Sequence, residues 1–157
     1  MATRAKTGLL GQPAIQYRNL NARQKENYNF LKLSGIMADF GFVTMRVSAD
    51  WEGADFIAQH NGGILFLKVQ LKSRLTLSKK YEGKDIYIAF RNGSGADADW
   101  YLFPHDEVLK RVKSSIGGTR SWGKGNYSWK RLSQNMRRLL DQYRIPSPDD
   151  CCSVVKK

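Results

Sequence analysis

The chain has 157 residues, enough for one domain with its own core, and a formal net charge of +12. This charge favours a polyanionic partner, above all nucleic acid, although a basic face can also simply be solvated. The sequence has no apolar stretch of membrane-spanning length, no apolar signal core at its basic N-terminus, and two adjacent cysteines, Cys151 and Cys152, without other partners. We therefore expect an intracellular protein of the cytoplasm or nucleoid that is not secreted.

Residues 1–20 are polar and basic and predict an irregular N-terminal arm. Asn21 is a suitable helix cap, and apolar residues at helical spacing behind it predict a helix that ends at Gly41. These apolar residues are Phe30, Leu33, Met37 and Phe40. Glu26 lies four residues before Phe30 and shares this buried stripe. Its carboxylate either favours the helix dipole in a frayed first turn or points at a functional site.

Apolar and alternating segments after this helix predict the strands of a sheet. The expected strands comprise residues 42–47, 54–60, 64–72, 84–91 and 100–103. Residues 48–53 are expected to connect the first two strands. Asn61-Gly62-Gly63 is a strong signal for a hairpin between the second and third strands. Pro104 is expected to stop the fifth strand.

Helices are expected again after the fifth strand. Residues 105–113 predict one helix, and Ser128 can cap a last helix through about residue 143. Residues 114–127 between them predict a loop rich in Gly, Ser and basic residues. This order of elements fits an α+β or α/β sandwich with a mixed sheet. The predicted division of the chain is an arm at 1–20, one domain at 21–145 with a basic extension at 114–145, and a tail at 146–157.

Positive charge is concentrated toward the C-terminus. Between Lys110 and Arg144 the chain has ten lysines and arginines and one acid, Asp141, which gives this stretch a net charge of +9. Residues 117–129 mix glycines, cations and aromatics, and either follow a phosphate backbone or pack on the core. We expect Trp129 to pack. The residues expected to contact DNA are Ser73, Arg74, Lys113, Arg120, Lys124, Lys130 and Arg131.

Asp55, Gln70 and Lys72 form the candidate catalytic site. Asp55 lies among apolar neighbours, where an unpaired carboxylate needs a metal, a lysine or hydrogen-bond donors. Gln70 and Lys72 are two residues apart on the next strand, so they point to the same face, and Asp55 can lie beside them in the hairpin. An acid, a second oxygen ligand and an ammonium suit metal-assisted hydrolysis of a phosphodiester. The alternative is a structural Asp–Lys ion pair without chemistry.

Hard oxygen ligands, few in number, favour Mg²⁺, for which Mn²⁺ can substitute. Asp55 would bind the cation, with Gln70 and the backbone carbonyl of Leu71 as further oxygen donors. The cation would neutralise charge on the scissile phosphate and lower the pKa of a bound water. Lys72 would orient that water or stabilise the developing charge. Glu52 lies close to Asp55 in the sequence and either adds a carboxylate or is a loop charge.

The pattern resembles the PD-(D/E)XK nuclease superfamily, which places an acid on a helix, an Asp at the end of one strand and (D/E)-X-K on the next. Glu26, Asp55 and Gln70-Leu71-Lys72 take those places, within a resemblance that covers about residues 22–110. It implies a restriction-endonuclease-like αβββαβ core with a mixed central sheet flanked by helices. It also implies a metal-dependent endonuclease similar to intron-encoded homing endonucleases of this fold or to Holliday-junction resolvases.

Gln70 departs from the family pattern, which usually has a carboxylate at this position. A glutamine supplies one neutral carbonyl oxygen and binds a cation less strongly. Three explanations stay open: an active Gln-X-Lys variant, a Glu-to-Gln change that traps an uncleaved complex, and a natural protein that only binds DNA.

We therefore expect a Mg²⁺-dependent endodeoxyribonuclease of the homing or restriction-like kind. It would act on double-stranded or branched DNA as a homodimer or homotetramer, because cutting two strands requires two sites. One alternative is a Holliday-junction resolvase. Another is a catalytically weakened DNA-binding protein of the same fold, and a more distant one is an RNA-binding module.

Overall fold

The computed structural model describes residues 11–93, 95, 98–148 and 151, and gives the backbone alone for residues 49–51. Residues 1–10 of the expected arm and most of the tail beyond residue 148 lie outside the described residues. The helices and strands are, in chain order, α1 (Ala22–Asp39), β1 (Phe42–Trp51), β2 (Ala54–His60), β3 (Phe66–Lys72), β4 (Thr76–Ser78), β5 (Ile86–Asn92), β6 (Asp99–Pro104), α2 (His105–Ile116), α3 (Arg120–Gly123), β7 (Asn126–Ser128) and α4 (Gln134–Leu140).

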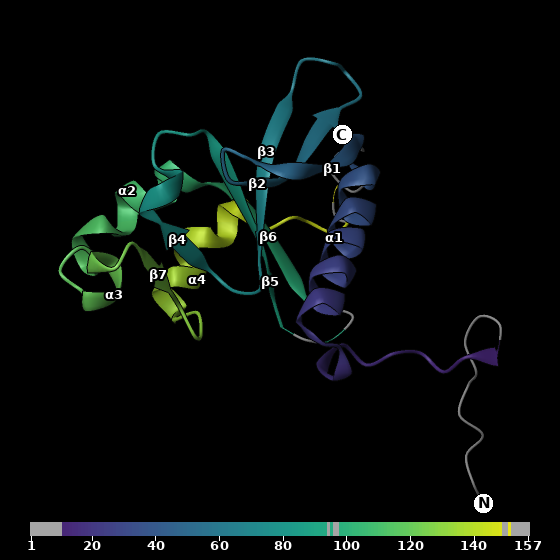
Figure 1. Ribbon diagram of the computed structural model, residues 1–157, viewed down its shortest axis with the longest axis horizontal. Coiled ribbons are helices and arrows are strands. Elements are labelled where there is room, and N and C mark those ends of the chain that lie inside the picture. Colours follow the sequence, from purple (N-terminus) through teal and green to yellow (C-terminus); the bar gives the residue numbers. More distant parts are fainter. Residues whose placement is uncertain (1–10, 94, 96–97, 149–150, 152–157) are drawn as a thin grey trace, which may run out of the picture.

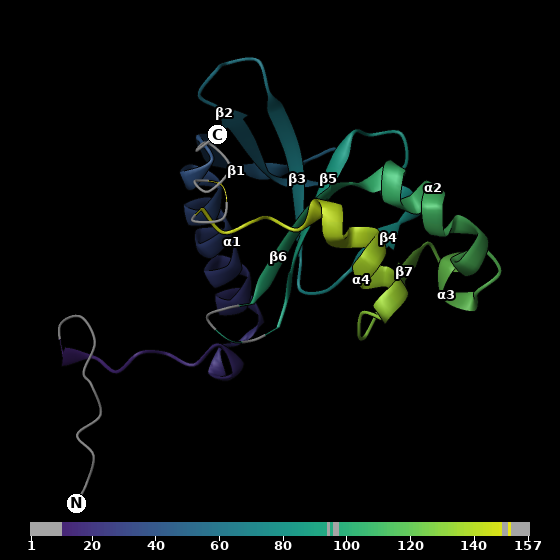
Figure 2. The same cartoon turned by 180° about the vertical axis from the view of Figure 1, so that it is seen from behind.

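A five-stranded mixed sheet, in the order β1-β2-β3-β5-β6, forms the centre of the fold. The β3–β5 pair is parallel, and the other neighbours are antiparallel. β4 and β7 pair separately as a small antiparallel sheet. In Figures 1 and 2, α1 lies along one side of the central sheet, whereas α2, α3, α4 and the small sheet gather on the other. The predicted α+β fold with a mixed sheet flanked by helices is confirmed.

The first helix begins where the sequence predicts. The Asn21 side chain accepts the N–H of Gln24 at 2.9 Å, and the Gln24 side chain accepts the N–H of Asn21 at 3.0 Å, which forms a capping box. Leu33 and Met37 are buried against the sheet. Gly41 has a φ of +80°, which favours glycine directly after a helix. Local sequence signals therefore fix both ends of α1.

Apolar residues form one cluster on each face of the sheet. The first cluster lies between α1 and the sheet and includes Leu33, Phe56 and Val69, all with no exposed surface. The second includes Ile88 and Phe103 and extends to α2, α4 and the small sheet. Because side chains alternate along a strand, the two clusters take opposite faces of the same strands. None of the helices in the described part of the chain is long and apolar enough to span a membrane.

The predicted β2–β3 hairpin is confirmed and extends beyond the rest of the sheet in Figure 1. Gly63 in its turn has a φ of +76°, a backbone conformation that suits glycine. The strand after the turn begins at Phe66 rather than at residue 64. Large exposed apolar residues gather on this hairpin and on the edge strand β1, namely Val43, Met45, Ile64, Leu65 and Phe66.

The expected connection at residues 48–53 was wrong, because β1 continues to Trp51. Pairing resumes at Trp51, opposite Ala54, after a register shift, and the turn consists of Glu52 and Gly53. Both turn residues have positive φ, at 56° and 93°. β1 is an edge strand, and edge strands tolerate polar residues on either face, so the alternating pattern that reveals a strand is missing here.

The expected loop at residues 114–127 was also wrong, because it contains a short helix and most of a short strand. The Thr119 side chain accepts the N–H of Trp122 at 3.2 Å and caps α3. Trp122 is buried, and Trp129 is partly buried against the same cluster, as we expected for Trp129. Elements of three or four residues are too short to produce a periodic pattern in the sequence.

Ser128 does not cap the last helix. It belongs to β7, where it pairs with Thr76 of β4. The cap is Ser133, whose side chain accepts the N–H of Met136 at 3.3 Å, and α4 then runs only to Leu140 before a 3₁₀ turn. Both serines suit a cap, and the pairing of β7 with β4 decides between them.

The connection from β3 to the parallel strand β5 departs from the expected αβββαβ order. Residues 73–85, all of which the structure describes, contain β4 and the 3₁₀ helix η3 (Lys79–Tyr81) where that order has a helix. A helix follows only after β6, as α2. This connection, called the crossover segment below, starts directly after Lys72 and therefore runs beside the candidate site.

The segment before α1 is fixed from Tyr17 onward. Residues 17–19 form a 3₁₀ turn, and the Tyr17 hydroxyl accepts a hydrogen bond from the Asn29 side chain at 2.8 Å. The Tyr17 ring also lies 5.3 Å from the ring of Tyr28, between centroids. The part of the expected arm that the structure describes thus packs against α1 at its end.

Candidate active site

The register of the β2–β3 hairpin brings Asp55 beside Gln70. Phe56 pairs with Val69, so Asp55 near the start of β2 lies opposite Gln70 near the end of β3. The Gln70 amide nitrogen donates to Oδ2 of Asp55 at 2.6 Å, and the backbone N–H of Leu71 donates to the same oxygen at 2.8 Å. One oxygen of the Asp55 carboxylate is therefore held by two donors from the neighbouring strand.

The Gln70 amide nitrogen lies near two oxygen atoms. Besides Oδ2 of Asp55, it approaches the backbone carbonyl oxygen of Leu71 at 3.4 Å. A group at this point faces a carboxylate and a carbonyl, which are the hard oxygen donors that Mg²⁺ prefers. A half-turn of the terminal amide would bring the Gln70 carbonyl oxygen to the same place. The residues present thus fit a small divalent cation.

Burial shifts the pKa values of Asp55 and Lys72 in opposite directions. The Asp55 side chain is open to solvent on one side, yet partial burial raises the pKa of its carboxyl, against the opposing effects of the Leu71 N–H, Lys72 and Gln70. Burial lowers the pKa of the Lys72 ammonium, and the charge of Lys80 lowers it further, while Asp55 opposes the shift. Each of the two groups is thus partly pushed toward its neutral form.

Lys72 and Asp55 influence each other without close contact. Lys72 is half-buried, and its Nζ lies 5.4 Å from the centroid of the Tyr81 ring. Among the described residues, Lys72 has no carboxylate oxygen within 4.0 Å. A structural Asp55–Lys72 ion pair, the alternative to a catalytic site, would bring the two charged groups into contact. The structure does not show this contact.

The Asp55–Gln70 pair opens into a pocket of about 350 Å³. Glu26 of α1, Arg46 of β1 and Lys80 of the crossover segment complete its charged wall. A second hollow, of about 580 Å³, shares Glu26 and Leu71 with the first and is lined by Lys72 and Ser73. The first pocket therefore combines two acids with two cations, and the second hollow adds Lys72, an arrangement that can hold both a metal ion and a phosphate.

Glu26 lies at the rim of this pocket rather than in the buried stripe that we expected. Its side chain is 66% exposed, and Oε1 lies 3.8 Å from Nη1 of Arg46. The Arg46 guanidinium also stacks on the Phe30 ring, 4.2 Å from its centroid. Glu26 still reaches the site, because its charge contributes to the raised pKa of Asp55.

Glu52 has a separate partner. Its carboxylate forms an ion pair with Nζ of Lys68 at 3.0 Å, and it does not line the pocket. No group of three or more His, Cys, Asp or Glu side chains across the described ranges is arranged to hold a metal ion. A cation at the site would thus depend on Asp55, backbone and amide oxygens and water, as Mg²⁺ commonly does.

Lys80 and Arg46 line the pocket although the sequence pattern did not single them out. Lys80 lies in the crossover segment, and Arg46 lies on the edge strand β1. Strand alternation places Arg46 on the same face as Phe56, toward α1. The alternation of side chains along β1 could have placed Arg46 on the face of the site. No local feature of the sequence indicates that Lys80 lies there.

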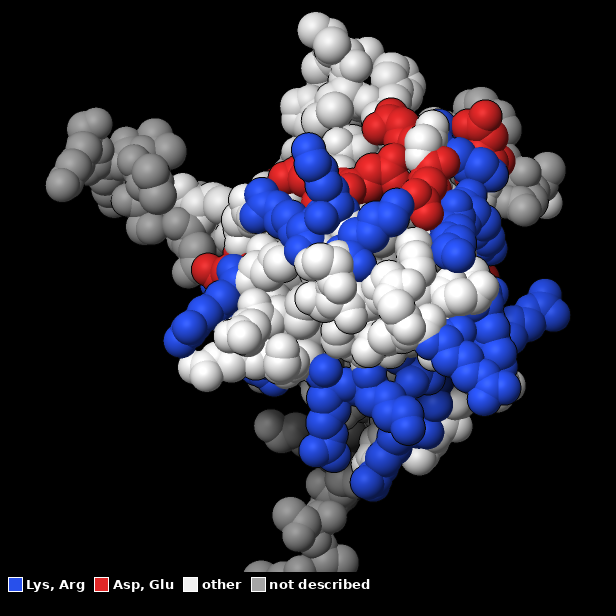
Figure 3. Space-filling model, turned by 90° about the vertical axis from the view of Figure 1, so that its left-hand side faces the viewer, with Lys and Arg blue, Asp and Glu red and all other residues white. Residues whose placement is uncertain are grey.

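The residues expected to contact DNA lie in several places. Arg120 in α3, Lys124 directly after α3, and Lys130 and Arg131 after β7 are exposed. Figure 3 shows Lys and Arg mixed with Asp and Glu in the upper part of the face it draws, and Lys and Arg without visible acidic residues among them in the lower part. Arg74 is exposed and Ser73 lines the second hollow, but Lys113 is engaged by Glu82, with its Nζ 3.3 Å from Oε2.

No protein-family model matches the chain, and no curated protein sequence matches it either. Among solved structures, the fold is similar to that of the Holliday junction resolvase Hjc of Archaeoglobus fulgidus, with 20% identity, a TM-score of 0.37, and coverage of 52% of this chain and 72% of that one. It is also similar to the bacterial homing endonuclease I-Ssp6803I, with 14% identity, a TM-score of 0.42, and coverage of 79% and 86%. At such identities the likeness does not decide the reaction.

Proposed function

We propose that the chain is a metal-dependent endodeoxyribonuclease that hydrolyses phosphodiester bonds in double-stranded or branched DNA, with Mg²⁺ as its cofactor and Mn²⁺ as a substitute. One observation carries the proposal. The Asp55 carboxylate and the Leu71 carbonyl converge on one point in an open pocket, and the half-buried Lys72 lines the adjoining hollow, which shares Leu71 with that pocket. A raised pKa on an acid and a lowered pKa on a lysine in two adjoining hollows are typical of catalytic sites.

The cation would be held by Asp55, the Leu71 carbonyl and the Gln70 carbonyl oxygen after the amide turns. When bound, a divalent cation neutralises charge on the phosphate and lowers the pKa of a bound water. The N–H of Leu71 donates to Oδ2 of Asp55 at 2.8 Å and holds the carboxylate in place. Holding the carboxylate in place before the substrate binds removes part of the ordering cost of the reaction.

Lys72 would hold the attacking water and accept its proton. Because burial and Lys80 lower its pKa, a larger fraction of Lys72 is neutral near neutral pH than of an exposed lysine. A neutral amine has a lone pair with which to accept a proton. After the transfer, the ammonium stabilises the negative charge that develops on the phosphate.

Cutting both strands of a duplex requires two such sites, and one copy of this chain has a single Asp55–Lys72 site in its described part. We therefore propose a homodimer or homotetramer. In a homing or restriction-like enzyme, two copies would bind a near-palindromic site. In a junction resolvase, they would recognise the shape of branched DNA. Sedimentation equilibrium with and without DNA measures the number of copies.

The basic surface supports a DNA substrate. Arg120 of α3, Lys124 directly after it, and Lys130 and Arg131 after β7 are exposed cations, and a polyanion that binds them releases counterions. The strength of such binding falls steeply with salt concentration. Competition between duplex DNA, branched DNA and RNA at a fixed salt concentration tests the substrate class, and a preference for RNA would contradict the proposal.

The activity is tested by nicking of a supercoiled plasmid in Mg²⁺ with the wild type, Lys72→Ala and Lys68→Ala. Lys68 is the matched control, since it lies on the same strand and face but pairs with Glu52. We expect cleavage by the wild type and by Lys68→Ala, and loss of cleavage in Lys72→Ala. Cleavage that survives in Lys72→Ala at the wild-type rate would contradict the proposed role of this lysine.

A second candidate function is DNA binding without catalysis. It is favoured by the hydrogen bond that the Gln70 amide donates to Asp55. This hydrogen bond stabilises the carboxylate without a bound cation. The wild type would then bind DNA in Mg²⁺ and in Mn²⁺ without cutting it. A Gln70→Glu variant that cuts under the same conditions would identify a weakened nuclease site, and one that does not cut would identify a binding protein.

A further inference from the structure

Lys80 is a cation without a role in the proposed reaction so far, although it lines the pocket of Asp55 and Gln70, called the reaction pocket below. It belongs to the 3₁₀ helix η3 of the crossover segment and lines the same pocket as Asp55 and Gln70. Lys80 is exposed, so its ammonium is accessible to a ligand that enters the pocket. Its neighbour Lys79 points elsewhere, with Nζ 5.6 Å from the Trp122 ring centroid. Of these two adjacent lysines, only Lys80 reaches the pocket.

Lys72 and Lys80 approach the same aromatic ring. The Nζ atoms lie 5.4 Å and 4.9 Å from the centroid of Tyr81, and the Tyr81 residue itself is fully buried. Cation–π attraction favours each ammonium at this distance. The two charges repel each other, and neither has a carboxylate oxygen within 4.0 Å in the part of the chain that the structure describes. Two cations that approach the same ring, neither in an ion pair with a carboxylate, fit a bound anion.

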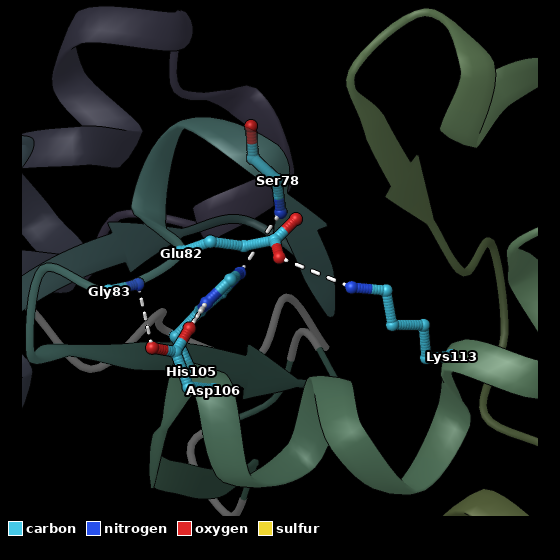
Figure 4. A network of polar contacts seen from close by, with 6 residues as sticks. All are labelled: Ser78, Glu82, Gly83, His105, Asp106 and Lys113. Atoms are coloured by element: carbon cyan, nitrogen blue, oxygen red, sulfur yellow. Dashed lines mark hydrogen bonds and ion pairs between the residues drawn. The ribbon is translucent and has the colours of Figure 1, made fainter.

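The start of the η3 turn is fixed to α2 and to the loop before β7. The buried ring of His105 accepts the backbone N–H of Ser78 on Nε2 at 3.2 Å, and Figure 4 shows this contact. The Ser78 hydroxyl donates to the carbonyl of Gly125 at 3.1 Å. The His105 ring also packs edge-on against Tyr81, with 5.6 Å between centroids. The Tyr81 ring, which both lysines approach, is therefore packed against the first residue of α2.

The end of the turn is fixed as well. The backbone N–H of Gly83 donates to Oδ2 of Asp106 at 2.8 Å, and Glu82 forms an ion pair with Lys113 at 3.3 Å (Figure 4). Lys80 thus projects from a short turn whose two ends are both attached to α2. A cation that is positioned before the substrate arrives loses little conformational entropy when it binds a phosphate.

We propose that Lys80 is a phosphate-binding residue of the reaction pocket, whose ammonium binds a non-bridging oxygen of the scissile phosphate while Lys72 acts on the attacking water. This inference rests on the proposed nuclease function, because it identifies the scissile phosphate as the ligand. A charge-assisted N–H···O contact of this kind is stronger than a neutral hydrogen bond. It gains strength as negative charge develops on the phosphate oxygens, so Lys80 acts in the reaction as well as in binding.

Two measurements test this role with Lys80→Ala, Lys80→Arg and the control Lys79→Ala. The first is the affinity for duplex DNA as a function of salt concentration, without divalent cation so that no cleavage occurs. A protein that neutralises one phosphate fewer has a slope of log K against log salt that is shallower by about 0.9. We expect this decrease in Lys80→Ala, a wild-type slope in Lys80→Arg, and a wild-type slope in Lys79→Ala.

The second measurement is the single-turnover rate of cleavage. We expect Lys80→Ala to lose about a hundredfold in rate. Lys80→Arg should recover most of the rate, and Lys79→Ala should match the wild type.

The two measurements separate failure of this inference from failure of the proposed function. If Lys80→Ala binds and cleaves like Lys79→Ala, the inference is overturned while the nuclease function stands. If the wild type binds DNA but does not cleave it, the nuclease function fails, and the salt dependence still decides whether Lys80 binds a phosphate. An unchanged slope in Lys80→Ala overturns the inference in that case too.

Discussion

The side-chain amide of Gln70 donates to the carboxylate of Asp55 across 2.6 Å. The hydrogen bond lowers the pKa of Asp55, although burial raises that pKa by more. The amide nitrogen also approaches the Leu71 carbonyl, so it occupies a point at which a cation would meet two oxygens. Gln70 thus acts as the partner of Asp55 when no metal is bound and has to turn when a metal binds.

Replacement of Gln70 by Glu should increase affinity for Mg²⁺ and destabilise the metal-free protein. The variant places two carboxylates side by side and removes the donor that Asp55 uses, in a residue that is only 9% exposed. We expect the free energy of unfolding without metal to fall by about 1–3 kcal/mol. Addition of Mg²⁺ should raise the melting temperature of Gln70→Glu more than that of the wild type. Equal responses to Mg²⁺ in thermal unfolding would contradict this account of the site.

Replacement of Lys72 by Met should abolish cleavage without loss of stability. Burial lowers the pKa of Lys72 from its ordinary value of 10.5, so the charged form is disfavoured in the folded protein. The charged lysine therefore lowers the free energy of unfolding near neutral pH. An apolar side chain of similar length removes this destabilisation. We expect an equal or higher melting temperature for Lys72→Met. A loss of about 3–5 kcal/mol would indicate a structural ion pair instead.

Asp55 should give the protein a characteristic dependence of stability on pH. Since its pKa is raised in the folded state, the folded protein binds more protons than the unfolded one, from about the ordinary value of 3.8 up to the raised pKa. The contribution of Asp55 to the free energy of unfolding therefore falls as pH rises through this window. The difference in unfolding free energy between the wild type and Asp55→Asn, measured by urea denaturation at several pH values, should show this fall. A difference that grows with pH would contradict the raised pKa.

His105 should be needed to position the crossover segment. It is 1% exposed and accepts the backbone N–H of Ser78, so His105→Phe keeps the ring packing but leaves that N–H without its acceptor. We expect a loss of about 1–3 kcal/mol in unfolding free energy. The cleavage rate of the folded variant should also fall with little change in DNA affinity, because the turn that carries Lys80 is less well held. Asp106→Asn, an exposed neighbour, should have the smaller effect on stability.

The exposed cations of α3 should contribute to DNA binding through phosphates rather than bases. We expect Arg120→Ala with Lys124→Ala to weaken binding equally for different DNA sequences, and to make the salt slope shallower by about 0.9 for each phosphate that is no longer neutralised. Arg111→Ala is a suitable control, since Arg111 is paired with Glu107 at 3.3 Å. A fall in affinity that depends on DNA sequence would place these residues at base edges instead.

The sequence predicts the features that depend on local chemistry. The capping of α1 by Asn21 follows from residues adjacent in the chain, and the β2–β3 hairpin follows from its glycine-rich turn. The hairpin in turn fixes the register that places Asp55 opposite Gln70, which is why a pair 15 residues apart could be predicted. Local signals are sufficient wherever one turn determines which residues meet.

The remaining features depend on contacts between distant segments. β4 and β7 are three residues each and pair with one another across about fifty residues of sequence, so neither has a pattern of its own. Lys80 reaches the pocket because His105 and Asp106 hold the crossover segment, and both belong to a later helix. Burial was wrongly expected for Glu26, because helical spacing places a residue on one side of the helix but does not show how far the sheet covers that side.

The most direct test of the account is the rate of phosphodiester hydrolysis in single-turnover cleavage of a supercoiled plasmid, with Mg²⁺ supplied to the wild type and to Asp55→Asn. Asparagine keeps the size of the side chain and one oxygen but removes the charge that would bind the cation. We predict that the wild type converts the plasmid to nicked or linear DNA, and that Asp55→Asn is slower by at least about a hundredfold while it still binds DNA. Equal rates in the two proteins would show that the carboxylate of Asp55 takes no part in the reaction and would contradict the central claim.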